Sequence, residues 1–147
     1  MPSSFYRSNI LPLLFVLFTV AINSHADEKK SSALKTYTAV VRHVVDGDSL
    51  YLVGVQRQIR LWGVDAPELK EPGYFAARNA LIKKVKGKGK RLRCVTQDHD
   101  RYGRIVARCF MAASNNMPAV DINEWMLKSR TAKEYCYFTK GFYGYCN

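Results

Sequence analysis

Residues 46–68 read DGDSLYLVGVQRQIRLWGVDAPE, and this stretch decides the fold. β-Branched, aromatic and other apolar residues dominate 49–53 and return at 58–64, which predicts two strands. Gly54 and the short polar segment after it predict a hairpin turn between those strands. Pro67 ends the second strand, because proline has no backbone N–H to donate to a sheet. The stretch therefore predicts a β-hairpin with acidic residues before its first strand and after its second.

Charged side chains gather at one end of this hairpin. Counting from the turn, Ser49 faces Arg60, so the carboxylate of Asp48 begins one residue pair away from that guanidinium. Asp65 lies just past the end of the Arg60 strand, and Glu68 follows it. Carboxylates this close repel one another unless a cation lies between them. Calcium or magnesium, which prefer oxygen ligands, would suit the site, and a surface ion-pair cluster with Arg60 is the alternative.

The residues of the DGD turn itself have different expected roles. Aspartate and glycine are common in turns, because glycine accepts a positive φ and aspartate bonds its own backbone. We therefore expect Asp46 and Gly47 to form the turn, and Asp48 to point toward a metal ion.

The rest of the chain alternates between strand and helix patterns. Strands are expected at 35–45, 91–96 and 104–112, and helices at 73–85 and 121–132. Asp121 is placed to cap the second helix, and Lys83 and Lys84 lie where the dipole of the first helix favours cations. Short strands with interspersed helices in one small domain predict a compact α+β barrel.

The first 26 residues have the three-part pattern of a secretory signal peptide. Arg7 lies in a short polar head, residues 10–22 are apolar, and small residues precede the cleavage point. The apolar run is short for a membrane span, and a retained membrane anchor is the alternative. We expect a flexible lead-in at 27–36 and one monomeric domain at 37–147, secreted or periplasmic and not inserted in a membrane.

The residues after the signal peptide are strongly basic. Removing Arg7 leaves 22 of the 23 lysines and arginines against 12 aspartates and glutamates, a net charge of +10. Such an excess favours a polyanionic partner such as nucleic acid, because the summed field attracts phosphates. Solubility alone needs much less charge. A cationic domain that binds anionic polymers of the cell envelope is an alternative on the same argument.

All four cysteines lie after the expected signal peptide. An even number in an exported chain predicts two disulfides, which allow three pairings. If the second hairpin turns at residues 101–102, Cys94 and Cys109 face each other at disulfide distance. Cys136 and Cys146 would then form the other bridge. A zinc site is the competing interpretation, but the spacing of the cysteines and histidines does not suit it.

Three short motifs occur in order along the chain: VVDGDS at 44–49, RLWGVDAPE at 60–68 and DRYGR at 100–104. Together they resemble the staphylococcal nuclease (thermonuclease) family, and the resemblance extends over about residues 37–132. It implies an α+β fold, a five-stranded OB-like β-barrel with two to three packed helices. It also implies a secreted, calcium-dependent hydrolase that cleaves phosphodiester bonds of DNA and RNA and leaves 3′-phosphates.

The resemblance also implies roles for individual residues. Asp48, Asp65 and the backbone carbonyl of Ala66 match the calcium ligands, Glu68 matches the general base, and Arg60 and Arg104 match the phosphate-binding arginines. Ala66 stands where the family often has threonine, and a backbone ligand tolerates that change. Arg130 replaces a glycine that the family often has near the end of the corresponding helix. The alternative function is a non-catalytic OB-fold module that binds nucleic acid.

The tail EYCYFTKGFYGYC, at 134–146, is rich in aromatic residues. We expect these rings to pack over the barrel, held by the second disulfide. Stacking on the bases of a single-stranded substrate is the alternative, with Tyr135 and Tyr137 as candidate contacts. Tyr102, on the turn beside Arg104, is the stronger candidate for a substrate contact.

Overall fold

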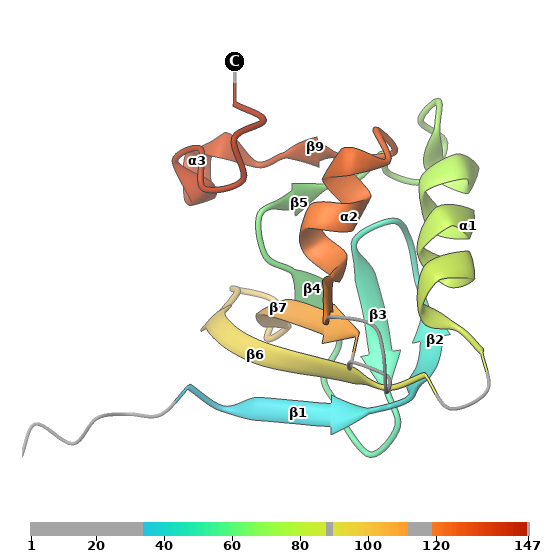
Figure 1. Cartoon of the computed structure of the whole chain (residues 1–147), viewed down its shortest axis with the longest axis vertical. Helices are drawn as coiled ribbons and strands as arrows, with labels where there is room; N and C mark the ends of the chain where they lie inside the picture. Colours follow the sequence, from blue (N-terminus) through green and yellow to red (C-terminus); the bar gives the residue numbers. More distant parts are fainter. Residues whose placement is uncertain (1–33, 88–89, 112–118, 147) are drawn as a thin grey trace, which may run out of the picture. The chain divides into compact units, whose positions relative to one another are not determined.

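The computed structural model describes residues 34–87, 90–111 and 119–146 (Figure 1). The expectations for the signal peptide, and for the lead-in before Leu34, lie outside these residues. Within them, no helix combines the length and the apolar character that crossing a membrane requires.

Seven strands of the described residues form the main sheet, in the order β1-β6-β7-β4-β3-β2 with β8 paired to β7. They are β1 (Thr36–Ala39), β2 (Val41–Val44), β3 (Ser49–Leu52), β4 (Ile59–Leu61), β6 (Leu92–His99), β7 (Ile105–Met111) and β8 (Val120–Asp121). Neighbouring strands are antiparallel except β4 and β7, which run parallel. A second, two-stranded sheet pairs β5 (Val64–Asp65) with β9 (Lys133–Glu134).

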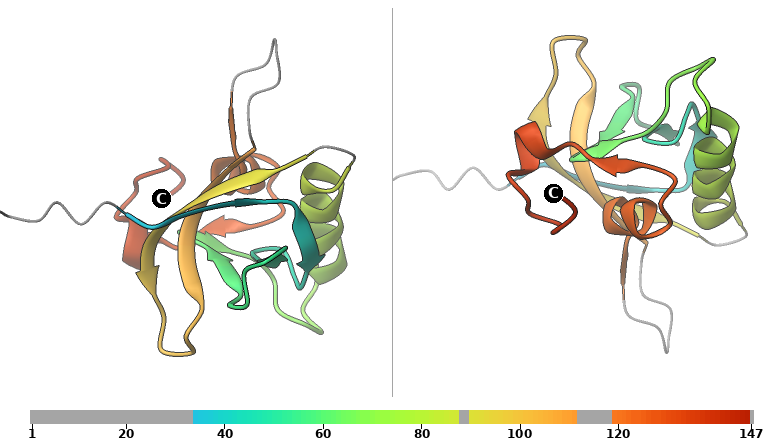
Figure 2. Two further views of the ribbon diagram at one scale, coloured as in Figure 1. Left: turned by 90° about the horizontal axis from the view of Figure 1, so that it is seen from below. Right: turned by 90° about the horizontal axis from the view of Figure 1, so that it is seen from above.

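The main sheet curls because its two outermost strands are one piece of chain. β1 and β2 lie at opposite ends of the strand order, yet only Val40 separates them, and Val53 donates its N–H to the Val40 carbonyl at 3.0 Å. Figure 2 shows this bent segment running along the sheet. Counted as one strand, β1 and β2 join β3, β4, β6 and β7 in a five-stranded barrel, so the predicted fold class is confirmed.

The first hairpin has the predicted register. Ser49 pairs with Arg60, and Leu61 donates its N–H to the Asp48 carbonyl at 2.7 Å. The expected continuous second strand is wrong, because a turn at Gly63, where φ is 73°, divides it into β4 and β5. This turn redirects the chain just before the acidic residues that follow β4.

The second hairpin also pairs the predicted cysteines. Cys94 lies opposite Cys109, and the two form a disulfide. The hairpin is centred on Tyr102, half a residue later than expected, and a one-residue irregularity in β6 restores the register. Cys136 and Cys146 form the other disulfide.

Three helices accompany the barrel in the described residues: α1 (Tyr74–Val85), α2 (Ile122–Lys128) and α3 (Cys136–Thr139). α1 packs against β2, and α2 packs against β7 and α1. Buried strand residues such as Leu50 and Ile59 meet Leu81 of α1 and Met126 of α2 in one hydrophobic core. The core therefore fixes both helices to the strands that carry the charged motifs.

The second long helix is shorter than predicted. Asp121 caps it as expected, accepting the N–H of Glu124 at 3.1 Å, but α2 ends four residues before residue 132. Arg130 has a φ of 57°, in the left-handed region, which a right-handed helix cannot include. The chain therefore turns into β9, where Lys133 pairs with Asp65. This pairing brings the C-terminal tail to the acidic end of the first hairpin.

Gly47 is required for close packing. A Cβ at this position would lie 2.6 Å from the Cβ atoms of both Ala66 and Ala77. Gly47 does not use the positive φ that glycine permits in turns. Asp46 has its predicted turn role and accepts the N–H of Asp48 at 3.0 Å. The missing side chain at Gly47 lets the turn, the loop after β5 and α1 approach one another.

Candidate active site

A groove of about 520 Å³ lies between β4, the β6–β7 turn and the C-terminal tail. Basic and aromatic side chains dominate its wall, with two acids beside them: Arg60, Arg101, Arg104, Tyr102, Tyr135, Phe138, Asp98 and Asp100. Four residues predicted from three separate segments, Arg60, Tyr102, Arg104 and Tyr135, therefore meet in one groove.

The guanidinium of Arg60 joins this groove to the two predicted calcium carboxylates. Its Nη1 lies 2.9 Å from Oδ2 of Asp48 and donates to the Val64 carbonyl at 2.5 Å. Its Nη2 lies 3.8 Å from Oδ1 of Asp65. The side chains of Arg60 and Asp48 are only 15% and 6% exposed, so this is a buried ion pair and not the surface cluster of the alternative interpretation. Asp48 and Asp65 converge on one guanidinium, as the hairpin register predicts.

The Asp48 carboxylate is tightly held in this buried position. Its Oδ1 accepts the hydroxyl of Ser49 at 2.9 Å, and its Oδ2 accepts the N–H of Ala66 at 2.9 Å. Burial raises the pKa of Asp48 to about 7, although Arg60 opposes that shift. One guanidinium therefore does not balance the buried negative charge. A further cation beside the carboxylate would stabilise its ionised form.

The other predicted acids lie nearer to solvent. The side chain of Asp65 is 57% exposed, whereas Ala66 is buried. Glu68 lies on an exposed loop, where its N–H donates to Oε2 of Glu71 at 2.8 Å. Asp65, Ala66 and Glu71 line a second groove of about 370 Å³. The structure does not bring Glu68 into the wall that the two arginines share.

The β6–β7 turn positions the second predicted arginine. Asp100 accepts the backbone N–H groups of Tyr102 and Arg104 through Oδ1, at 2.9 and 3.0 Å, and its Oδ2 lies 2.5 Å from Nε of Arg104. Burial raises the pKa of Asp100, but the hydrogen bonds from Arg104 outweigh it and hold the pKa below its ordinary value. Because Asp100 binds Nε, the two terminal amino groups are the part of Arg104 that can bind an anion.

The aromatic tail follows the expected packing over the barrel only in part, and Phe142 is one ring that does, because it lies edge to face against Trp62 with the ring centroids 5.4 Å apart. Tyr143 packs against the core, but five rings are between 42% and 70% exposed: Tyr135, Tyr137, Phe138, Phe142 and Tyr145. Tyr135 and Phe138 line the groove, whereas Tyr137 does not. The tail therefore offers aromatic surface both inside the groove and beyond it.

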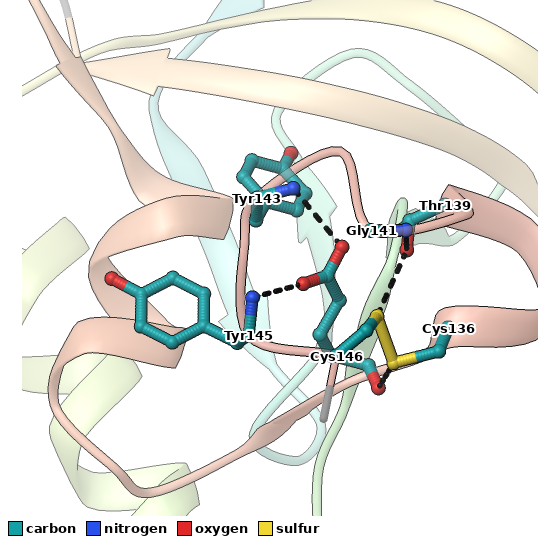
Figure 3. Close-up of a disulfide and its surroundings, with 7 residues drawn as sticks. Cys136, Thr139, Gly141, Tyr143, Tyr145 and Cys146 are labelled. Atoms are coloured by element: carbon teal, nitrogen blue, oxygen red, sulfur yellow. Dashed lines mark hydrogen bonds between the residues drawn. A yellow bond between two sulfur atoms is a disulfide. The ribbon is translucent and has the colours of Figure 1, made fainter.

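A buried glutamate, which no sequence motif indicated, organises this tail. The carboxylate of Glu134 accepts the N–H of Tyr143 at 3.0 Å and the N–H of Tyr145 at 2.7 Å (Figure 3). The Cys136–Cys146 disulfide closes the loop next to it. Burial raises the pKa of Glu134, but the hydrogen bonds that its carboxylate accepts outweigh burial and lower the pKa. The tail is thus held at two points.

Asn123 is a second residue that no motif indicated. Its side chain is fully buried, and Oδ1 accepts the N–H of Cys109 at 2.9 Å. Its Nδ2 donates to the carbonyls of Trp62 and Ala107, at 2.9 and 3.1 Å. Asn123 therefore fastens α2 to β7 and to the turn after β4, which lines the groove. In the sequence, the one available sign of this buried role is a polar residue within an apolar helical pattern.

Residues 58–144 match the family model described as Staphylococcal nuclease homologue, and this segment includes Arg60, Asp65, Glu68 and Arg104. The chain is 33% identical over 111 residues to "Probable staphylococcal-like nuclease CAN1" of Oryza sativa subsp. japonica, covering 74% of this chain and 31% of that protein. It is 32% identical over 103 residues to "Thermonuclease" of Staphylococcus intermedius, covering 64% and 61%. It is 31% identical over 109 residues to "Succinoglycan biosynthesis protein ExoI" of Rhizobium meliloti (strain 1021), covering 68% and 53%.

These alignments cover between 31% and 61% of the three relatives, so the chain spans less than two thirds of their length. The family model, by contrast, covers more than half of this chain. The motifs, the curled five-stranded barrel and this match agree, which confirms the resemblance seen in the sequence. The chain belongs to the staphylococcal nuclease family.

Proposed function

We propose that this chain is an exported, calcium-dependent nuclease that hydrolyses phosphodiester bonds of DNA and RNA. The observation that carries the proposal is the groove shared by Arg60 and Arg104, with the carboxylates of Asp48 and Asp65 on the guanidinium of Arg60. Two of the similar proteins bear nuclease names, and the net charge of +10 after the expected signal peptide suits a polyanionic substrate. The two disulfides support export, because such bonds persist in oxidising compartments.

Calcium is the proposed cofactor, with Asp48, Asp65 and the backbone carbonyl of Ala66 as its ligands. The donor set fits, because calcium prefers hard oxygen ligands and carboxylates in particular. Burial raises the pKa of Asp48 to about 7, and this also supports a cation site, because a nearby dication would favour the ionised carboxylate. The chemistry that calcium supplies when bound is Lewis-acid stabilisation of negative charge on a phosphoryl oxygen.

Arg60 and Arg104 are the proposed phosphate-binding residues. Asp100 holds Arg104 by Nε, and Asp48 and Val64 hold Arg60 by Nη1, so both guanidiniums are oriented before substrate binds. Planar guanidiniums can bind two phosphate oxygens at once. Their attraction grows as the attack of water concentrates negative charge around phosphorus. A preorganised donor of this kind contributes about 100- to 1,000-fold to the rate.

Glu68 is the proposed general base. Its carboxylate lies on an exposed loop three residues after Asp65, where water has access. Water attacks phosphorus and its proton passes to Glu68. The P–O bond to the 5′ oxygen breaks, the 5′ oxygen takes a proton from solvent and leaves as a hydroxyl, and the other product carries a 3′-phosphate. General-base catalysis contributes about 100- to 10,000-fold. Because phosphate contacts carry no sequence information directly, we expect cleavage with little sequence specificity.

The test is a cleavage assay with supercoiled plasmid and heat-denatured DNA. The purified protein should cut both in calcium, and excess chelator should abolish the cutting. Glu68→Gln should lose most activity and keep the melting temperature of the parent, because the changed side chain is exposed. Cutting that persists in chelator would overturn the calcium-dependent mechanism.

A binding module without catalysis is the second candidate, and the position of Glu68 outside the arginine groove favours it. On that account the protein would retain DNA in a gel-shift assay and never cut it. Failure both to cut and to retain DNA would favour the third candidate, a domain that binds anionic envelope polymers.

A further inference from the structure

The second groove, of about 370 Å³, meets the first groove at the contact between Arg60 and Asp65. Val64 lines the first groove, and the next residue, Asp65, lines the second. Nη2 of Arg60, in the first groove, lies 3.8 Å from Oδ1 of Asp65. One wall of the second groove comes from β5 and the loop after it, and the other comes from residues 130–133. A long ligand bound at Arg60 can therefore extend into the second groove.

The two walls of the second groove carry opposite charges that do not pair with each other. Asp65 and Glu71 lie on one wall. Arg130 and Lys133, both exposed, lie on the other. Lys133 is the strand neighbour of Asp65, yet no ion pair of the described residues includes Lys133 or Arg130. The two cations are therefore available to an anionic ligand.

The backbone presents Arg130 to this groove in a strained conformation. Its φ of 57° lies in the left-handed region, which a residue with a side chain adopts only at a cost. The turn is held in place, because the N–H of Arg130 donates to the Leu127 carbonyl at 3.0 Å and the hydroxyls of Ser129 and Thr131 lie 2.7 Å apart. Backbone strain kept at an exposed side chain that packing does not explain is typical of functional sites.

A phosphate of a nucleic-acid strand fits the basic wall. Nucleic acid carries a phosphate on every nucleotide, so a strand with one phosphate at Arg60 and Arg104 has others to place nearby. Guanidinium and ammonium groups both bind phosphate oxygens. The acidic wall would repel a phosphate, and the calcium ion proposed at Asp65 would offset that repulsion. A phosphate contact does not read the bases, so it agrees with cleavage of little sequence specificity.

We propose that Arg130 and Lys133 form a second phosphate subsite, which binds the substrate strand beyond the phosphate held by Arg60 and Arg104. The subsite rests on the proposed nuclease function and extends the substrate-binding surface from one groove to two. Each phosphate contact of a single strand adds about 0.7 to the slope of log affinity against log salt concentration. Over a tenfold range of salt, that slope corresponds to about 5-fold in affinity.

The test is fluorescence anisotropy with labelled oligo(dT) over a salt series from about 0.1 to 1 M. Excess chelator is present, and intact oligonucleotide is verified on a gel. Arg130→Gln and Lys133→Gln should each reduce the salt slope by about 0.7 and weaken binding by about 5-fold at the lowest salt. Their affinities should approach that of the parent at the highest salt, because the lost contact is purely ionic.

Lys86→Gln is the matched control, because it removes the same charge from an exposed residue that lines neither groove. Its salt slope should stay within about 0.2 of the parent. Arg130→Gly separates binding from folding, since glycine accepts the φ of 57° without strain. This variant should be at least as stable as the parent and still bind oligo(dT) about 5-fold more weakly at the lowest salt.

Two results would overturn the subsite. One is an unchanged salt slope in Arg130→Gln or in Lys133→Gln. The other is a reduction in Lys86→Gln as large as theirs, which would show that only the total charge matters. A folded parent protein that does not bind oligo(dT) at all would instead refute the proposed function, so the two failures are distinguishable in one experiment.

Discussion

Replacing Arg60 with lysine separates the proposed catalytic role of the guanidinium from its role in the buried ion pair. Nη1 of Arg60 contacts Asp48 and Val64, and Nη2 lies near Asp65. A lysine ammonium can keep the pair with Asp48 but cannot reach all three groups at once. We expect Arg60→Lys to lower the free energy of unfolding by about 1.5–3 kcal/mol, the range for a lost hydrogen bond to a charged group.

The loss of activity should be much larger than the loss of stability implies. Without the planar fork, kcat/KM on denatured DNA should fall by about 100- to 1,000-fold at a temperature where the variant is folded. Arg60→Ala should destabilise by about 3–5 kcal/mol, because it leaves the buried carboxylate of Asp48 unpaired. Lysine is therefore the informative change.

The measurements are calcium-dependent cleavage rates and urea denaturation on the same preparations. Arg57→Lys is the matched control, since Arg57 lies exposed on the turn between β3 and β4, and its kcat/KM should stay within about 2-fold of the parent. A folded Arg60→Lys variant whose kcat/KM remains within 10-fold of the parent would refute the role of Arg60 in the transition state.

Three further changes test how the fold supports the site. Asn123→Ala should lower the free energy of unfolding in urea by about 2–4 kcal/mol, because the buried N–H of Cys109 loses its acceptor; a loss below 1 kcal/mol would contradict this. Arg130→Gly should raise it by about 0.5–1 kcal/mol, since glycine accepts the φ of 57° without strain, and Arg130→Ala should give no such gain. Glu134→Gln should lower it by about 1–3 kcal/mol at pH 7. Because the pKa of Glu134 is below its ordinary value of 4.5, the parent should lose its stability advantage over Glu134→Gln as the pH falls below 4.5. A stability difference between the two proteins that stays constant across that pH range would contradict a stabilising role for the Glu134 carboxylate.

Both hairpin registers could be predicted because antiparallel pairing is a matter of counting. Once the turn is located, Ser49 must face Arg60. Cys94 faces Cys109 as predicted because the irregularity in β6 offsets the half-residue difference in the position of the second turn. The convergence of Asp48 and Asp65 on Arg60 follows from the same count. The short-range pattern of the sequence therefore predicted the two hairpins and the convergence of Asp48 and Asp65 on Arg60.

The remaining features depend on tertiary packing, which leaves no repeating pattern in the sequence and so could not be predicted from it. Gly47 resembles an ordinary turn glycine, and its need for a missing side chain appears only when Ala66 and Ala77 are placed against it. Arg130 lies within the predicted helix, yet α2 ends at Lys128 and the φ of 57° at Arg130 is incompatible with a right-handed helix. The aromatic tail was expected to pack over the barrel, and Phe142 and Tyr143 do so against Trp62. The other rings stay exposed on the loop that Glu134 and the disulfide hold.

The mechanism depends most on one claim, that Asp48 and Asp65 together bind a divalent cation beside Arg60. Isothermal titration with calcium tests it directly, because the readout does not depend on activity. We expect one calcium ion per chain in the parent and loss of the binding heat in Asp65→Asn. Binding should be unchanged in Asp98→Asn, which removes an exposed carboxylate of the groove that Arg60 lines. Calcium binding that survives Asp65→Asn, or no calcium binding in the folded parent, would contradict the account.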